Sequence, residues 1–153
     1  MHPLLEELHV YHRGVSATID RIKQLLKVLG SGVDEAADCE QLYRMLESLH
    51  GEAETKHHQN EELIREKLLA TEAPLHQCVR DIERDHQGFE RIAKQLGALE
   101  QSGLNSKEIA AFVEDYIRKY YDHMDREENI FFPMADEWIM DEQWQDIKQH
   151  WQQ

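Results

Sequence analysis

Two stretches of the sequence repeat one arrangement of side chains that can bind metal. HMDREENIFFP (residues 123–133) and HHQNEELIREK (residues 57–67) each place a glutamate four residues after a histidine. Four residues make about one turn of an α-helix, so each pair shares one helix face. An imidazole and a carboxylate on one face can bind a first-row transition metal or form a hydrogen-bonded pair. The direction of that face decides between a solvated ion pair and a buried site.

The positions of proline and glycine divide the rest of the chain into long segments. The prolines are Pro3, Pro74 and Pro133, and the glycine breaks lie at residues 30–32 and at Gly103. No strictly alternating run of β-branched residues occurs, so no strands are expected. The breaks predict four long helices over about 3–30, 35–71, 74–101 and 106–131.

The short connections between these helices predict an all-α fold. Consecutive helices with short loops run antiparallel, so we expect an up-down-up-down antiparallel four-helix bundle. Asn105 and Glu108 resemble a capping box for the fourth helix. A short extra helix is expected to begin near Asp141, with its tryptophans over one end of the bundle. The predicted organisation is one domain over 1–153, with the bundle over about 3–134 and the C-terminal helix within 135–153.

Each predicted helix carries an apolar stripe at steps of three and four residues, as in bundle helices that face a core. Histidine or glutamate interrupts these stripes at six positions, which are His12, His57, Glu61, His86, His123 and Glu127. The positions match in depth: His86 lies 17 residues before Gly103, and His123 lies 17 residues after Ser106. The six side chains are therefore expected to meet in one layer. His58 lies about 100° off the stripe and is not expected to bind metal.

Six polar side chains in a core must satisfy one another. Burying one unpaired polar group costs about 2–7 kcal/mol, whereas a whole domain is stable by only about 5–15 kcal/mol. A hydrogen-bond network between the histidines and glutamates is one solution, and a metal site is the other. Four imidazoles and two carboxylates favour the metal site, with iron or another first-row metal rather than calcium or magnesium. Six ligands suit two ions bridged by the two carboxylates.

Four motifs resemble signatures of the hemerythrin-like family, also called the HHE cation-binding domain. They are YHRGV around His12, HHQNEELI from His57, RDHQGFERI around His86 and HMDREENIFFP from His123. The resemblance covers about residues 5–134. It implies a non-heme centre of two iron ions, joined by an oxo or hydroxo bridge, inside a four-helix bundle. It also implies that the four stripe histidines are terminal ligands and that Glu61 and Glu127 are bridging carboxylates.

The sequence departs from the oxygen-carrying members of this family at one position. Those members place a second histidine one turn before the ligand on the third helix, and here that position is Ile82. A fifth terminal histidine is therefore missing from its expected place, and His50 is the spare histidine that comes nearest to the core. The four-histidine set resembles the iron-centre-repair and nitric-oxide-response members more closely. It leaves about one open position on each octahedral iron, which disfavours reversible oxygen transport.

Three classes of function are compatible with these residues. The first is a di-iron protein that binds or reacts with oxygen, nitric oxide or peroxide, in sensing, stress response or iron homeostasis. The second is an enzyme that reduces nitric oxide or peroxide, or that repairs iron–sulfur centres. The third is a structural bundle that holds metal incidentally.

The charge of the chain excludes several partners. It has 31 acidic residues against 17 Lys and Arg, for a net charge of −14. That field repels nucleic acid and anionic membranes. The resemblance to the hemerythrin-like family implies a small diatomic ligand or peroxide as the partner. No apolar run of 18 residues and no signal-peptide pattern occurs. Cys39 and Cys78 are interpreted as thiols of a cytoplasmic protein, with one disulfide as the alternative.

Overall fold

The computed structural model describes residues 1–29 and 35–153, and this part of the chain contains helices and no strand. The long elements are α1 (Pro3–Val28), α2 (Glu35–Ser48), α3 (Glu52–Leu69), α4 (Gln77–Gly97) and α5 (Ser106–Arg126). The shorter ones are a 3-10 turn η1 (Leu99–Gln101), a π-helical turn η2 (Glu127–Phe131), α6 (Phe132–Trp138) and α7 (Asp141–His150).

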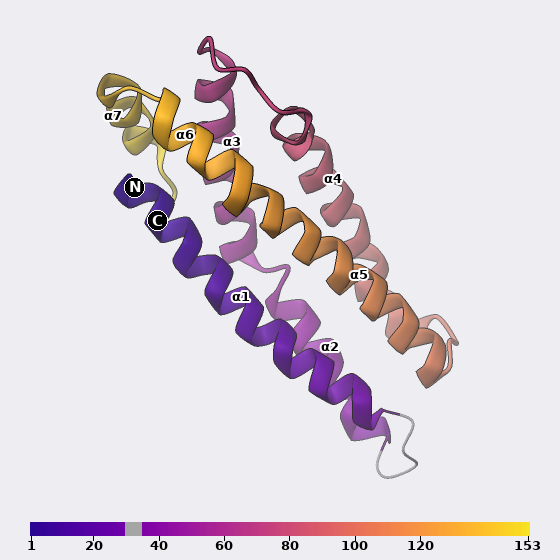
Figure 1. Ribbon diagram of the computed structural model, residues 1–153. Helices are drawn as coiled ribbons and strands as arrows, with labels where there is room; N and C mark the ends of the chain where they lie inside the picture. The colour runs from indigo at the N-terminus through magenta and orange to yellow at the C-terminus, as the bar shows by residue number, and fades with distance from the viewer. Residues whose placement is uncertain (30–34) are drawn as a thin grey trace.

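The elements form the predicted four-helix bundle. Figure 1 shows α1, the α2–α3 pair, α4 and α5 running side by side in alternating directions, with α6 continuing from α5. The short C-terminal helix, α7, packs against α3 at the end of the bundle where α1 begins. The glycine break expected at residues 30–32 lies outside the described residues.

Polar side chains at the helix starts fix two of the boundaries. Asn105 accepts a hydrogen bond from the backbone N–H of Glu108, whose carboxylate accepts one from the backbone of Asn105. The predicted capping box of α5 is therefore confirmed. At α4 the ring of His76 accepts from the backbone N–H of Cys78. The helix begins after this cap, three residues beyond Pro74.

The C-terminal helix is held against the bundle end by one tryptophan. Trp144 is buried and stacks on the His2 ring, with ring centroids 4.0 Å apart. Trp138 is exposed, and Trp151 is half-buried and donates from its ring nitrogen to Glu7. Of the three tryptophans expected over this end, Trp144 therefore contributes most to packing.

The helix predicted over 35–71 is broken into two. The last turn of α2 tightens to hydrogen bonds three residues apart, and the chain turns at Leu49–Gly51 before α3 begins. Because α3 starts anew after this turn, the inward-facing position at its beginning is shifted by one residue. Ala53, four residues before His57, is exposed, whereas Glu54, three residues before His57, is buried. A charged side chain thus enters the interior about one turn before the pair formed by His57 and Glu61.

A second break in register follows the motif on α5. The segment Glu127–Phe131 is a π-helical turn, in which hydrogen bonds join residues five apart, so one more residue fits into the turn. Ile130 and Met134, which continue the spacing of three and four residues after Glu127, are consequently only half-buried. Phe131 and Ala135, each one residue later, are fully buried instead.

Two apolar clusters flank the level at which the polar residues interrupt the stripes. One cluster lies toward the α1–α2 connection and includes Ile19, Leu42 and Val113. The other lies toward α7 and includes Leu5 and Ile64. Each cluster contains side chains from all four rods of the bundle, if α2 and α3 count as one rod and α5, η2 and α6 as another. The polar layer therefore lies between two apolar regions.

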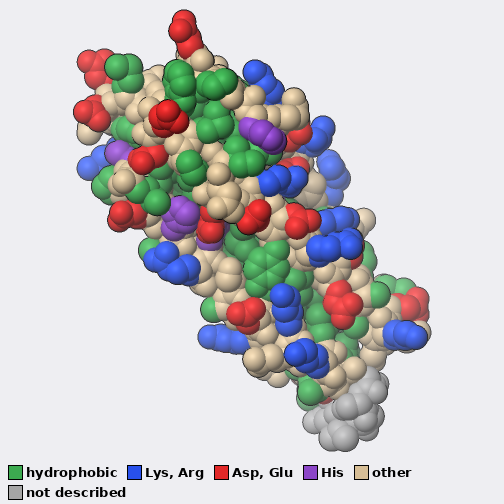
Figure 2. All heavy atoms as spheres, viewed as in Figure 1, with side chains coloured by type: hydrophobic (Ala, Val, Ile, Leu, Met, Phe, Trp, Pro, Cys, Tyr) green, Lys and Arg blue, Asp and Glu red, His purple; other side chains and the backbone are tan. Residues whose placement is uncertain are grey.

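The surface is charged and mixed in sign. Figure 2 shows acidic and basic side chains interspersed over one face, with apolar side chains gathered toward the end that carries α6 and α7. Cys39 and Cys78 are not joined by a disulfide. Among the described helices, none has the length and apolar character needed to cross a bilayer.

We expect Phe131→Ala to destabilise the protein far more than Ile130→Ala. Removing a fully buried phenylalanine side chain costs about 3–5 kcal/mol, whereas Ile130 is half-buried and should cost less than half as much. Urea unfolding of both variants in the presence of chelator measures the two losses. Equal losses, or a larger loss for Ile130→Ala, would contradict the π-helical turn.

Candidate metal centre

The six predicted side chains meet in one buried layer. They come from α1 (His12), α3 (His57 and Glu61), α4 (His86), α5 (His123) and the first residue of η2 (Glu127). The two carboxylates are the most deeply buried, with relative exposures of 0% for Glu61 and 1% for Glu127. The depth argument from the sequence therefore agrees with the observed positions.

Glu61 presents its two oxygens to different histidines. Its Oε1 lies 2.8 Å from His57 Nε2 and 3.4 Å from His12 Nε2. Its Oε2 lies 3.1 Å from His86 Nε2. One carboxylate thus faces a histidine pair on one side and a third histidine on the other.

Glu127 divides its oxygens in the same way. Its Oε2 lies 3.4 Å from His12 Nε2. Its Oε1 lies 2.8 Å from His123 Nε2 and 3.5 Å from His86 Nε2. Together the two carboxylates lie between a pair formed by His12 and His57 and a pair formed by His86 and His123. This is the arrangement expected of two carboxylates that bridge two ions.

Outer carboxylates orient three of the histidines. The contacts are His12 Nδ1 to Glu128 Oε1 at 2.9 Å, His86 Nδ1 to Glu62 Oε1 at 3.0 Å, and His123 Nδ1 to Asp85 Oδ2 at 3.4 Å. An ionised carboxylate only accepts, so each Nδ1 carries the hydrogen and each Nε2 directs a lone pair inward. Metal-binding histidines are typically oriented by such outer partners.

Most of the inward-facing oxygen and nitrogen atoms of the layer have no hydrogen-bond partner among the described residues. Within the described part of the chain, both oxygens of Glu61 and Glu127 and the Nε2 atoms of His86 and His123 lack a hydrogen-bond partner. The Nε2 atoms of His12 and His57 face each other at 3.1 Å. Orphaned lone pairs beside buried carboxylates are costly, and metal cations between them would satisfy all of them.

The electrostatics of the layer also favour cations. Burial alone would lower the pKa of His12, but the nearby carboxylates of Glu127 and Glu61 outweigh it and raise the pKa to about 11. Burial alone would raise the pKa of Glu61, yet the charge of His57 and the surrounding histidines hold it well below its usual range. Protons and metal ions therefore compete for the same nitrogen atoms.

The nitrogen and oxygen atoms group around two positions. In one group, ring nitrogens of His12 and His57 and an oxygen of Glu61 lie within 4.8 Å of one another. In the other, an oxygen of Glu61 and ring nitrogens of His58, His86 and His123 do so. Glu61 belongs to both groups. Imidazole and carboxylate donors in this number fit a pair of first-row transition metals.

His58, which lies off the stripe in the sequence, has its ring beside the buried layer in the structure. Its side chain is 13% exposed, and its ring stacks on that of His86 with centroids 4.0 Å apart and an interplanar angle of 16°. Its Nε2 lies 3.0 Å from Glu54 Oε1. The stripe pattern did not indicate that His58 lies beside the layer, because the pattern describes the inward face of a helix as a single row of residues. The adjacent histidines and the Glu54–His58 spacing were the available signals.

Glu54 is a further buried carboxylate that sequence reasoning missed. Its Oε2 accepts from the Tyr11 hydroxyl at 2.6 Å, and its Oε1 accepts from the Tyr120 hydroxyl. Burial alone would raise the pKa of Glu54, but the hydrogen bonds from His58, Tyr11 and Tyr120 outweigh it and hold the pKa at about 2. Glu54 is therefore a fixed anion next to the metal-binding layer.

His50, expected as the nearest spare histidine, lies outside both groups in the described structure. Its ring lies 5.3 Å from that of Tyr116, and its Nε2 has no hydrogen-bond partner among the described residues. It belongs to the wall of a cleft rather than to the buried layer.

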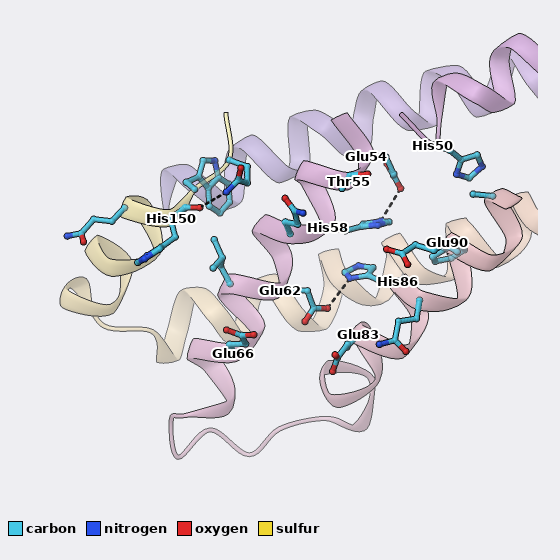
Figure 3. A pocket seen from close by; sticks show the side chains of 18 residues that line it. His50, Glu54, Thr55, His58, Glu62, Glu66, Glu83, His86, Glu90 and His150 are labelled. Atoms are coloured by element: carbon cyan, nitrogen blue, oxygen red, sulfur yellow. Dashed lines mark hydrogen bonds and ion pairs between the residues drawn. The ribbon is translucent and has the colours of Figure 1, made fainter. Parts of the chain in front are cut away.

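That cleft runs from solvent to the layer between α3 and α4, with the C-terminal residues at one end (Figure 3). Its volume is about 870 Å³. His58 and His86 lie at its inner wall, and Glu62 and Glu90 are among the carboxylates that line it. Small molecules and ions thus have a route to the second group of ligand atoms.

Comparison with known families agrees with these features. The model of the hemerythrin HHE cation binding domain matches residues 4–135, which is most of the chain. No curated protein and no solved structure gives a significant match.

We expect the protein loaded with cobalt(II) to melt at a higher temperature than the stripped protein. An ion at 100 times its Kd adds about 2.7 kcal/mol, and each kcal/mol moves the Tm of a chain of this size by about 2–4 °C. Adding a strong chelator should therefore lower the Tm by at least about 5 °C.

Differential scanning calorimetry with metal analysis checks this expectation. Glu61→Ala is the matched control, because it lacks one shared carboxylate and should respond little to the chelator. An unchanged Tm in the unmodified chain, with the metal verified as removed, would show that the layer does not need cations.

Proposed function

Since the chain belongs to the hemerythrin HHE cation-binding family, we propose that it is a di-iron protein that binds or reacts with oxygen, nitric oxide or peroxide. The observation that carries this proposal is the pair of buried carboxylates whose oxygens divide between two histidine pairs. Sensing, stress response and iron homeostasis are the settings in which such chemistry is useful.

Each member of the layer has a distinct role in this proposal. His12 and His57 would hold one ion, and His86 and His123 would hold the other. Glu61 and Glu127, which lie between the two pairs, would be shared by the ions and compensate their charge. Iron suits this mixed nitrogen and oxygen donor set, and when bound it supplies exchangeable electrons and a position at which a small molecule can bind.

The surrounding residues control the environment of the centre. Glu128, Glu62 and Asp85 keep the histidine rings aligned through Nδ1. The two apolar clusters exclude water from the ends of the layer. The cleft beside His86 admits a small ligand from solvent. A buried, aligned and accessible pair of metals is suited to capturing a diatomic molecule.

The proposal predicts close to two irons per chain after anaerobic reconstitution. His57→Ala and His123→Ala remove one donor from each position and should lower the iron content. His150→Ala, a change at an exposed position on α7, should leave it unchanged. Iron analysis of the four proteins tests this, and a content near one in the unmodified chain would refute the two-iron centre.

The same preparation tests the reactivity. Optical spectra of the reduced protein should change on adding oxygen and, separately, on adding nitric oxide. The His123→Ala variant should lose most of each change. A reduced protein that holds two irons but responds to neither gas nor to peroxide would favour a structural role for the metal.

A further inference from the structure

We propose that His58 is a fifth histidine ligand of the centre, at the position held by His86 and His123. This inference rests on the proposed two-metal function and deepens it, because it makes the two metal positions unequal. Sequence spacing alone leaves each position with two histidines.

The first support is the reach of the His58 ring. One of its nitrogens lies within 4.8 Å of ligand atoms of Glu61, His86 and His123. Bonds from a metal to nitrogen or oxygen are about 2.0–2.2 Å long, so ligand atoms on opposite sides of one ion are about 4.4 Å apart. The four atoms are therefore close enough to surround one ion. The His58 ring must also tilt away from its stacked position on His86, because an imidazole lone pair lies in the plane of its ring.

The second support is the outer partner of His58. Glu54 contacts His58 Nε2 at 3.0 Å, just as carboxylates contact the outer nitrogens of His12, His86 and His123. Glu54 is itself fixed by hydroxyls of Tyr11 and Tyr120. A ring oriented by a buried, fully engaged carboxylate has the environment of a metal ligand.

The third support is the lack of another fifth donor nearby. Ile82 occupies the position one turn before His86 and is a buried apolar residue. His50 lies outside both groups of ligand atoms in the described chain. His58 reaches the same metal position from α3 instead of α4, so the neighbouring helix supplies the missing nitrogen.

The consequence is an asymmetric pair of metals. The position with His58, His86 and His123 has three imidazoles and both carboxylates. The position with His12 and His57 has two imidazoles and both carboxylates, and therefore retains the more open coordination.

Anaerobic titration with cobalt(II) tests the assignment, using the visible absorption of the ion to follow each site. The unmodified chain should bind two ions. His58→Gln keeps the side-chain volume but lacks the imidazole, and should keep one ion while binding the other more than 100-fold more weakly. Loss of an outer partner costs only about 10–100-fold, so Glu54→Gln should fall in that smaller range.

His50→Gln is the matched control, because His50 lies on the same cleft wall and outside both groups. It should bind two ions with unchanged affinity. Binding of fewer than two ions by the unmodified chain would refute the proposed two-metal function itself. Two ions in the unmodified chain and unchanged affinities in His58→Gln would overturn only the role of His58.

Rescue with free imidazole tests whether His58 binds the metal itself or only donates a hydrogen bond. His58→Gly opens space at the inner wall of the cleft, through which imidazole can enter. Imidazole should restore the second cobalt(II) site in His58→Gly and should not affect His50→Gln. Tight binding of two ions by His58→Gly without imidazole would refute the role of His58 as a metal ligand.

Discussion

The structure depends on burying two carboxylates side by side. Glu61 and Glu127 are the least exposed ionisable groups in the layer, and the charge of each disfavours ionisation of the other. The pKa of Glu127 is nevertheless held well below its usual range, because His123 and the other histidines outweigh both burial and the charge of Glu61. Each of the four rods of the bundle contributes at least one histidine or glutamate to the layer. Packing of the helices and neutralisation of the buried charges therefore depend on the same side chains.

Charge alternates outward from this pair. The carboxylates are surrounded by inward-facing imidazole nitrogens, and the imidazoles are in turn bordered by carboxylates at half-exposed positions such as Glu62, Asp85 and Glu128. The outer shell fixes the ring orientations without being buried itself. Glu54 is the exception, since it is buried and relies on two tyrosine hydroxyls and on His58. The side of the layer nearest the cleft thus has a buried carboxylate where the other sides have half-exposed ones.

Much of this arrangement could be predicted from the sequence, because it follows from one regular period. Stripes with steps of three and four residues identified the inward face of His12, His86 and His123. Equal spacing from the connections then brought the residues to one level. The structure departs from the regular stripes where the helical period is interrupted. The restart after Gly51 brought Glu54 into the core in place of Ala53.

His58 shows a different limit of the same reasoning. A residue 100° from the centre of a stripe still borders the interior of a four-helix bundle, because each helix contacts two neighbours. His58 lies toward α4, where it stacks on His86, whereas His57 lies toward α1, where it faces His12. Two adjacent histidines can therefore serve two different helix interfaces. No single-helix periodicity contains that information.

The π-helical turn at Glu127–Phe131 affects how this chain must be compared with its relatives. Such a turn is an α-helix that has accommodated one inserted residue. In a relative whose helix continues without the turn, the matching segment is one residue shorter. A correct alignment then requires a single-residue gap inside these five positions. Motif spacings counted across it differ by one between proteins whose side chains occupy the same place in space.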